Sequence, residues 1–105
     1  MLKAMLTIRF RSDMDADVAA EYWRTVHRDL VLATPGMVAY AQNRRMEQVG
    51  GPVSWDGIVQ LSFEDERAFR EALASEHWAS VIADAENFVD VESIEMAVVA
   101  EQVHR

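Results

Sequence analysis

His27 is the side chain of this 105-residue chain best placed for proton chemistry. It follows Trp23 by four residues and precedes Leu30 by three, within a segment whose apolar residues recur at helical spacing. An imidazole has an ordinary pKa of about 6.5, which suits proton transfer near neutral pH. We therefore take His27 as a candidate acid/base or ligand-contacting residue. The structural alternative is a histidine at the border of the core that bonds to a backbone carbonyl.

Several other side chains could contact a ligand. Tyr40 could offer its phenol to a substrate oxygen, although a tyrosine half inside the core is the simpler interpretation. Arg9 could anchor an anionic or carbonyl group, or it could pair with Glu95 across neighbouring strands. The candidate substrate-binding residues are Trp23, Arg9, Gln60 and Trp55. Trp23 and Trp78 also lie on helical apolar stripes, which predict plain core positions.

The usual metal and nucleotide motifs are absent from the sequence. The three histidines, at positions 27, 77 and 104, have no spacing typical of paired metal ligands, and there is no cysteine. Gly50-Gly51 lacks the lysine of a phosphate-binding loop, and no Gly-x-Ser-x-Gly sequence occurs. We therefore expect a protein that needs neither a metal nor another cofactor.

Charge restricts the partners. The formal net charge is −8, and residues 53–105 alone carry three arginines against twelve Asp and Glu. A nucleic-acid or anionic-membrane partner needs a basic surface, so we expect neither. The absence of cysteine, with no signal-peptide pattern at the start, favours a reducing, cytoplasmic location.

The hydropathy pattern predicts six elements. Apolar and polar residues alternate over 2–10, 37–48, 57–63 and 93–101, which indicates four strands. Helical spacing covers 15–33, with capping oxygens at Ser12 and Asp13, and a second helical region begins at Asp65 and restarts at Ser75. The order strand, helix, strand, strand, helix, strand predicts one α+β domain over residues 1–105, with the ferredoxin-like βαββαβ fold and a four-stranded antiparallel sheet.

Both helices of this fold cover one face of the sheet, so the other face stays open. That face is expected to mix apolar side chains with polar ones, among them Met5, Ile58, Ala97 and Val99 beside Thr7, Arg9, Gln60 and Glu95. A second copy packed across a two-fold axis would cover it. We expect a homodimer in which two sheets enclose a barrel with a partly polar interior.

The chain resembles the EthD-like branch of the dimeric α/β-barrel superfamily over nearly its whole length. The resemblance rests on Tyr22-Trp23 followed by His27, Pro35-Gly36, Trp55-Asp56-Gly57-Ile58, Phe63, Phe88, Asp90 and Val99-Ala100-Glu101. It implies a homodimer with a pocket between sheet and helices. Some relatives accompany ether or aromatic degradation, and others act on aromatic polyketides without metal or flavin. Several relatives carry Gly-Pro after the helical histidine, where this chain has Arg28-Asp29.

Haem-degrading members of the same superfamily suggest an alternative for His77. They place an iron-binding histidine on the second helix and an asparagine on the first strand. The first strand here carries Thr7 and no asparagine, and Ser75-Glu76-His77 is typical of an exposed, capped helix start. Haem degradation is therefore the less favoured reading.

Two classes of function fit these residues. The first is a cofactor-free enzyme with His27 as acid/base, acting by isomerisation, decarboxylation or oxygenation on a small apolar or aromatic oxygenated compound beside Trp23 and Tyr40. The second is a non-catalytic barrel that binds a hydrophobic ligand or serves as an accessory protein. His27→Ala separates the two, since only the enzyme loses turnover while its fold remains.

Overall fold

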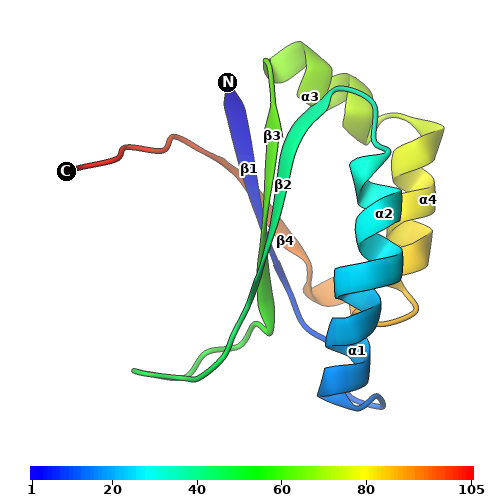
Figure 1. Ribbon diagram of the computed structural model, residues 1–105, viewed down its shortest axis with the longest axis vertical. Helices are drawn as coiled ribbons and strands as arrows, with labels where there is room; N and C mark the ends of the chain where they lie inside the picture. The colour runs from blue at the N-terminus through cyan, green and yellow to red at the C-terminus, as the bar shows by residue number, and fades with distance from the viewer.

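The computed structural model describes all 105 residues and has the predicted order of elements. The strands are β1 (Leu2–Ile8), β2 (Met37–Arg44), β3 (Gly57–Phe63) and β4 (Glu95–Val99). The helical elements are α1 (Ala16–Tyr22), η1 (Trp23–His27), α2 (Arg28–Leu32), α3 (Glu66–Leu73), α4 (Glu76–Ala85) and η2 (Val91–Ser93). All strand pairs are antiparallel, in the order β2-β3-β1-β4. The predicted ferredoxin-like α+β fold is confirmed (Figure 1).

The alternating pattern of β1 assigns the two faces of the sheet. Ala4, Leu6 and Ile8 are at most 6% exposed and face the helices. In β2, which the sequence left unoriented, Tyr40 pairs with Leu61, so both lie on this buried face. A break in register between Met37 and Ala39 leaves Val38 half-exposed, which explains why the start of β2 is apolar on both sides.

The first helix differs from the prediction in two ways. Its N-cap is Asp15, whose side chain accepts hydrogen bonds from the amides of Asp17 and Val18, whereas Ser12 and Asp13 were expected to cap it. The helix is also interrupted by the π-helical segment η1, over Trp23–His27. Such segments are rare and often occur at functional sites.

The second helical region begins as predicted. Asp65 accepts a hydrogen bond from the amide of Ala68, and Ser75 accepts one from the amide of Trp78. Three strands are shorter than predicted. β1 ends at Ile8, and Phe10 makes only an isolated bridge with Val89. β2 ends at Arg44 because the chain then leaves the sheet, and β4 ends at Val99 because its last partner on β1 is Lys3.

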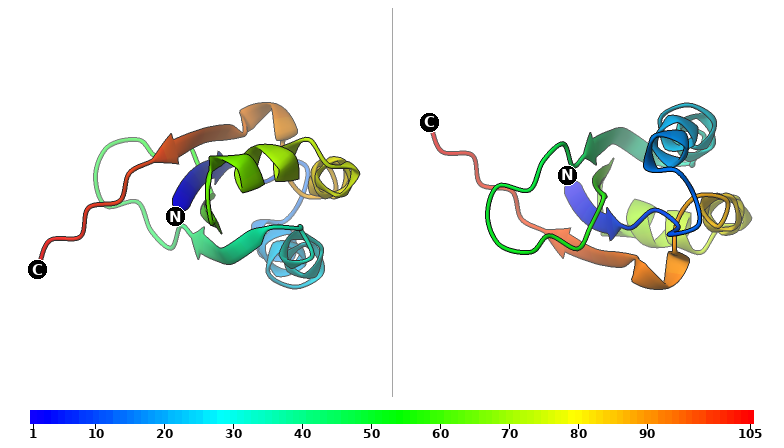
Figure 2. Two further views of the ribbon diagram at one scale, coloured as in Figure 1. Left: turned by 90° about the horizontal axis from the view of Figure 1, so that it is seen from above. Right: turned by 90° about the horizontal axis from the view of Figure 1, so that it is seen from below.

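All helices cover one face of the sheet, and the other face has no covering layer (Figures 1 and 2). The register places Met5 between Gln60 on β3 and Ala97 on β4, on this open face. The expected mixture of apolar and polar side chains is therefore present on it. None of the helices has the length and apolar character that crossing a membrane requires.

Candidate functional site

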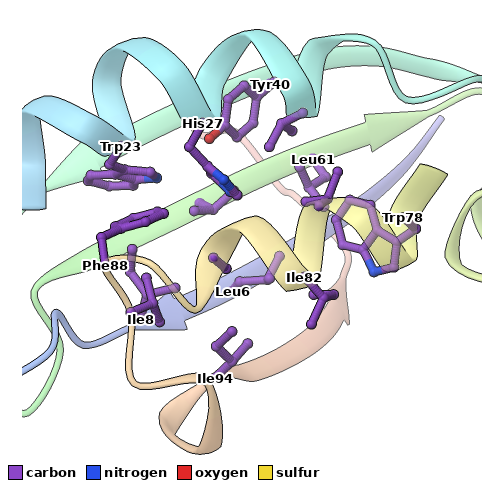
Figure 3. A pocket seen from close by; sticks show the side chains of 15 residues that line it. Leu6, Ile8, Trp23, His27, Tyr40, Leu61, Trp78, Ile82, Phe88 and Ile94 are labelled. Carbon is purple, nitrogen blue, oxygen red and sulfur yellow. The ribbon is translucent and has the colours of Figure 1, made fainter. Parts of the chain in front are cut away.

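A small apolar cavity lies between the sheet and the helices, and His27 forms part of its wall. Fourteen of the fifteen lining residues are hydrophobic. The lining side chains come from β1, β2, β3, η1, α2, α4 and the segment that leads into β4, and the ring of His27 points in among them (Figure 3). The cavity volume open to the centres of water molecules is about 40 Å³, which is room for about three water-sized groups.

His27 is held from its outer side by a carboxylate. Its Nδ1 lies 2.8 Å from Oδ2 of Asp84, on α4. The His27 side chain is 9% exposed and that of Asp84 is 18% exposed, so the pair is largely shielded from water. An acceptor at Nδ1 favours the tautomer that carries its proton there, which leaves a lone pair on Nε2. No group of the protein bonds to Nε2.

Asp84 is itself fixed by two further side chains. The Tyr22 hydroxyl donates to Oδ1 at 2.6 Å, and the Asn87 amide donates to the same oxygen at 3.3 Å. Desolvation acts to raise the pKa of Asp84, but hydrogen bonds from Tyr22 and His27 outweigh it and hold that pKa below its ordinary value. The carboxylate is therefore charged at neutral pH.

Burial lowers the pKa of His27 below its ordinary value of 6.5, against the opposing effect of Asp84. The imidazole is consequently neutral at pH 7. An edge-on contact with Phe88, with ring centroids 4.9 Å apart, further limits its rotation. A neutral, oriented imidazole with a free lone pair in an apolar cavity can act as a general base.

Tyr40 brings the second polar group of the cavity wall. The Gln42 amide donates to the Tyr40 oxygen at 2.7 Å and to the backbone carbonyl of Trp23 at 2.8 Å. The backbone carbonyl of Trp23 can only accept a hydrogen bond, so the group of Gln42 that faces it must be the amide nitrogen. The same nitrogen faces the Tyr40 oxygen, which therefore acts as the acceptor. The phenolic proton is then free to be donated elsewhere. Burial raises the pKa of Tyr40, which keeps the phenol protonated.

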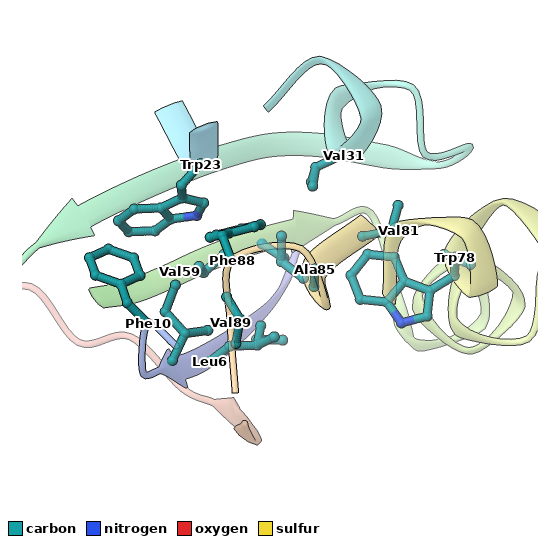
Figure 4. Packing of buried hydrophobic residues seen from close by; sticks show 14 of the residues in the cluster. Leu6, Phe10, Trp23, Val31, Val59, Trp78, Val81, Ala85, Phe88 and Val89 are labelled. Carbon is teal, nitrogen blue, oxygen red and sulfur yellow. The ribbon is translucent and has the colours of Figure 1, made fainter. Parts of the chain in front are cut away.

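Trp23 closes one end of the cavity and is 3% exposed. Its ring meets Phe10 edge-on, with centroids 5.9 Å apart (Figure 4). The far edge of the ring lies against the backbone of Gly57, where an added Cβ would come within 2.5 Å of Trp23 Cη2. Glycine at the start of β3 therefore lets this indole lie flush with the sheet.

The candidate residues from the sequence divide into two groups. His27, Tyr40 and Trp23 line the same cavity, together with Trp78. Gln60 lies on the open face of the sheet, and Arg9 and Trp55 line a polar hollow that also contains Glu95. No ion pair joins Arg9 to Glu95; instead Arg9 Nε donates to the carbonyl of Ser54 at 2.8 Å.

His77 is only partly exposed, whereas the sequence predicted an exposed helix start. Its Nε2 lies 2.8 Å from the carbonyl oxygen of Leu30, so it joins α4 to α2. No three side chains of His, Asp or Glu converge in a way that could hold a metal ion.

Asp84 and Gln42 were not predicted from the sequence. Asp84 is 57 residues from His27 in the chain, and it lies beside Ala85 on the flank of an apolar helix face. A lone carboxylate bordering such a face was the available signal. Gln42 was not singled out because β2 could not be oriented without its partner strand.

Comparison with known proteins gives a family and a fold. The model of the EthD domain matches residues 11–92, and no curated protein matches the chain. An EthD family protein from Bacillus halodurans is 15% identical, with a TM-score of 0.78 over 97% of this chain and 100% of that one. A protein from Arabidopsis thaliana is 14% identical, with a TM-score of 0.75 over 100% and 99%. A dimeric ferredoxin-like protein of unknown function from Thermobifida fusca is 17% identical, with a TM-score of 0.73 over 95% and 90%.

Proposed function

Because this chain belongs to the EthD domain family, we propose that it is a homodimeric, cofactor-independent enzyme that removes a proton from a small, largely apolar, oxygenated compound. The observation that carries this proposal is the His27–Asp84 pair, which presents an unpartnered Nε2 to an apolar cavity. The homodimer is supported by the open sheet face and by relatives described as dimeric. Those relatives support it by fold alone.

In the proposed reaction, His27 is the catalytic base and Tyr40 the hydrogen-bond donor. A carbon–hydrogen bond next to a carbonyl breaks, the proton goes to Nε2 of His27, and the electron pair moves to the carbonyl oxygen. The free phenolic proton of Tyr40 stabilises the resulting enolate oxygen. Return of the proton to the same or a neighbouring carbon completes an exchange or an isomerisation with no net oxidation.

The cavity wall restricts the substrate class. It contains no cationic side chain, so a carboxylate would lose its hydration without gaining a partner. A neutral ketone with one polar centre fits His27 and Tyr40, the two polar groups to which the proposed reaction assigns a role. Because the space admits about three water-sized groups, a larger compound must displace side chains. Ile82 and Ile94 line the cavity and are only partly buried, so we propose that they move when a larger compound binds (Figure 3).

Exchange of α-hydrogens for deuterium tests the proposal without knowledge of the natural substrate. Butan-2-one, cyclohexanone and acetophenone are incubated with the protein in D₂O and followed by proton NMR. We expect exchange above the buffer rate for at least one ketone, and about a 10²–10⁴-fold loss in His27→Ala. His104→Ala, which removes an exposed histidine, is the matched control and should exchange like wild type. Exchange that persists in folded His27→Ala would refute the role of His27.

Asp84 is proposed as a positioning residue that acts through His27. Asp84→Asn removes the charge that opposes the effect of burial, so the pKa of His27 should fall further and the base should weaken. The expected result is a slower plateau rate together with a pH–rate midpoint shifted to lower pH. A merely structural role would lower stability and leave this midpoint unchanged, so an unshifted midpoint would contradict the proposal.

A non-catalytic ligand-binding role is the second candidate, favoured by the nearly complete apolar lining of the cavity. A binding protein would show saturable binding of acetophenone by NMR or calorimetry, with no exchange and with similar affinity in His27→Ala. The enzyme proposal requires exchange as well as binding. The two results together distinguish the candidates.

A further inference from the structure

The chain between β2 and β3 projects beyond the open face of the sheet, away from the helices. We call residues 46–53 the arm, and Arg45 with residues 54–56 its base. The C-terminal segment, residues 100–105, projects on the same side from the opposite end of the sheet (Figures 1 and 2). We propose that the arm clasps a second copy of this chain and supplies part of the dimer contact. This inference rests on the proposed homodimer.

The flat area of the sheet face is about half of the surface that a stable interface buries per partner. The strands have 7, 8, 7 and 5 residues. With about 4.8 Å between strands and about 3.3 Å per residue, the flat face measures roughly 400 Å². Stable interfaces bury about 800 Å² per partner. Side chains add to the flat area, and a projection beyond the sheet would enlarge the contact further.

The arm carries exposed apolar side chains of the kind that an interface buries. Met46 is 88% exposed and Val49 is 87% exposed. Of the eleven large hydrophobic residues that are exposed, only Val18, Val26 and Leu32 lie on helices. The other eight lie on the sheet or on the segments that extend from it. Met96 and Val98 pair with Leu6 and Ala4 on the face that carries the helices, whereas Met46 and Val49 lie on the arm and Val99 lies on the open face.

The base of the arm is firmly fixed. Arg9 Nε donates to the carbonyl of Ser54 at 2.8 Å, and Arg45 Nε donates to that of Trp55 at 2.9 Å. Asp56 accepts from the amide of Phe10 at 2.8 Å and pairs with Arg45 at 3.3 Å. A projection held in place before binding loses less conformational freedom on association. Arg9 and the backbone of Trp55 thus help to hold the base of the arm in place.

A second copy is the occupant that the surface chemistry favours. Each copy offers apolar side chains along the open face of β4, where Ala97 pairs with Met5, and where Val99 pairs with Lys3 and is 37% exposed. A two-fold axis uses every contact twice. The arm itself contains only one charged residue, Glu47, so nothing on it would attract an anionic membrane.

The test is the dimer dissociation constant, measured by analytical ultracentrifugation over a concentration series. Met46→Ser/Val49→Ser should raise this constant at least tenfold. The matched control, Val18→Ser/Val26→Ser, removes two exposed valines from the helical side and should stay within twofold of wild type. Circular dichroism should show that both variants are folded, as expected for exposed positions.

Three outcomes would overturn the inference. A wild-type dimer that both variants leave intact removes the arm from the contact while the homodimer stands. A wild-type monomer at every concentration removes the homodimer as well. Binding of wild type to vesicles containing phosphatidylserine, lost in the arm variant, would identify a membrane as the occupant. The ketone exchange assay, run in parallel, reports on His27 independently of all three.

Discussion

Gly57→Ala tests whether the close approach of an indole to the sheet positions the wall of the cavity. An ideal Cβ at this position would lie 2.5 Å from Cη2, 3.0 Å from Cζ3 and 3.3 Å from Cζ2 of Trp23. All three atoms belong to the six-membered ring of one rigid side chain. The contact cannot be relieved by the movement of a flexible chain end, so the whole indole or the strand must shift.

The cost follows from the distances. An ordinary carbon–carbon contact is about 3.5–4.0 Å, so the ring must move by about 1 Å. Trp23 is 3% exposed and packs edge-on against Phe10, which leaves it little free space except the cavity. Overpacking of this kind costs about 1–3 kcal/mol. For a domain of this size, 2 kcal/mol lowers Tm by about 8–16 °C.

The assay is urea unfolding followed by circular dichroism, combined with a double-mutant cycle. Trp23→Phe removes the far edge of the indole, so Gly57→Ala should cost much less in that background than in wild type, with a coupling energy of about 1 kcal/mol or more. Gly50→Ala is the matched control, since nothing lies within 4 Å of a Cβ at that position. It should change the free energy of unfolding by less than about 0.5 kcal/mol.

Additive effects of the two substitutions would contradict this explanation. If Gly57→Ala destabilises the Trp23→Phe protein as much as wild type, the contact with the indole is not the source of the cost. A destabilisation below about 0.5 kcal/mol in wild type would show that the sheet and ring adjust freely. In either case Gly57 would not be the residue that sets the position of Trp23.

Three further changes have definite expected outcomes. Because burial lowers the pKa of His27, the unfolded chain binds a proton at this histidine before the folded chain does, and the free energy of unfolding falls from about pH 7 downward. His27→Gln should make the free energy of unfolding depend less on pH between about pH 7 and 5. An equal pH dependence in wild type and variant would contradict this expectation. Thr34→Val removes a buried hydroxyl that has no hydrogen-bond partner, so the free energy of unfolding, measured with urea, should rise by about 1 kcal/mol. A lower free energy of unfolding would contradict this expectation. Ser75→Ala removes the cap of α4 and should cost about 1 kcal/mol in thermal unfolding, whereas an unchanged Tm would show that the cap is dispensable.

The sequence predicts the fold well because local patterns determine most of it. The alternation in β1 and β3 gives the buried face directly, and Asp65 and Ser75 mark the helix starts by residue type alone. The errors lie where distant residues decide. The break in register beside Val38 depends on the pairing of β2 with β3, and the π-helical turn at Trp23–His27 has no signature in residue spacing.

The candidate site is predictable only in part, for the same reason. His27 could be found from its place on a helical stripe, but the carboxylate that orients it comes from a helix 57 residues away. The residue type and position of Arg9 predicted an anion-binding side chain, yet its Nε donates to the backbone carbonyl of Ser54. Long-range contacts of this kind depend on how the layers pack.

Strand β3 contributes both to the proposed catalytic cavity and to the proposed dimer interface, because successive side chains of a strand point to opposite faces of the sheet. Val59 and Leu61 line the cavity, whereas Ile58 and Gln60 lie on the open face. A change at Gln60 should therefore alter association and leave the cavity wall intact, and a change at Leu61 should do the reverse. Gln60 was predicted to bind substrate, and its place in the sheet makes it the better probe of the dimer. If Gln60→Ala slowed ketone exchange while the dimer remained, the division of the sheet into a chemical face and an association face would be wrong.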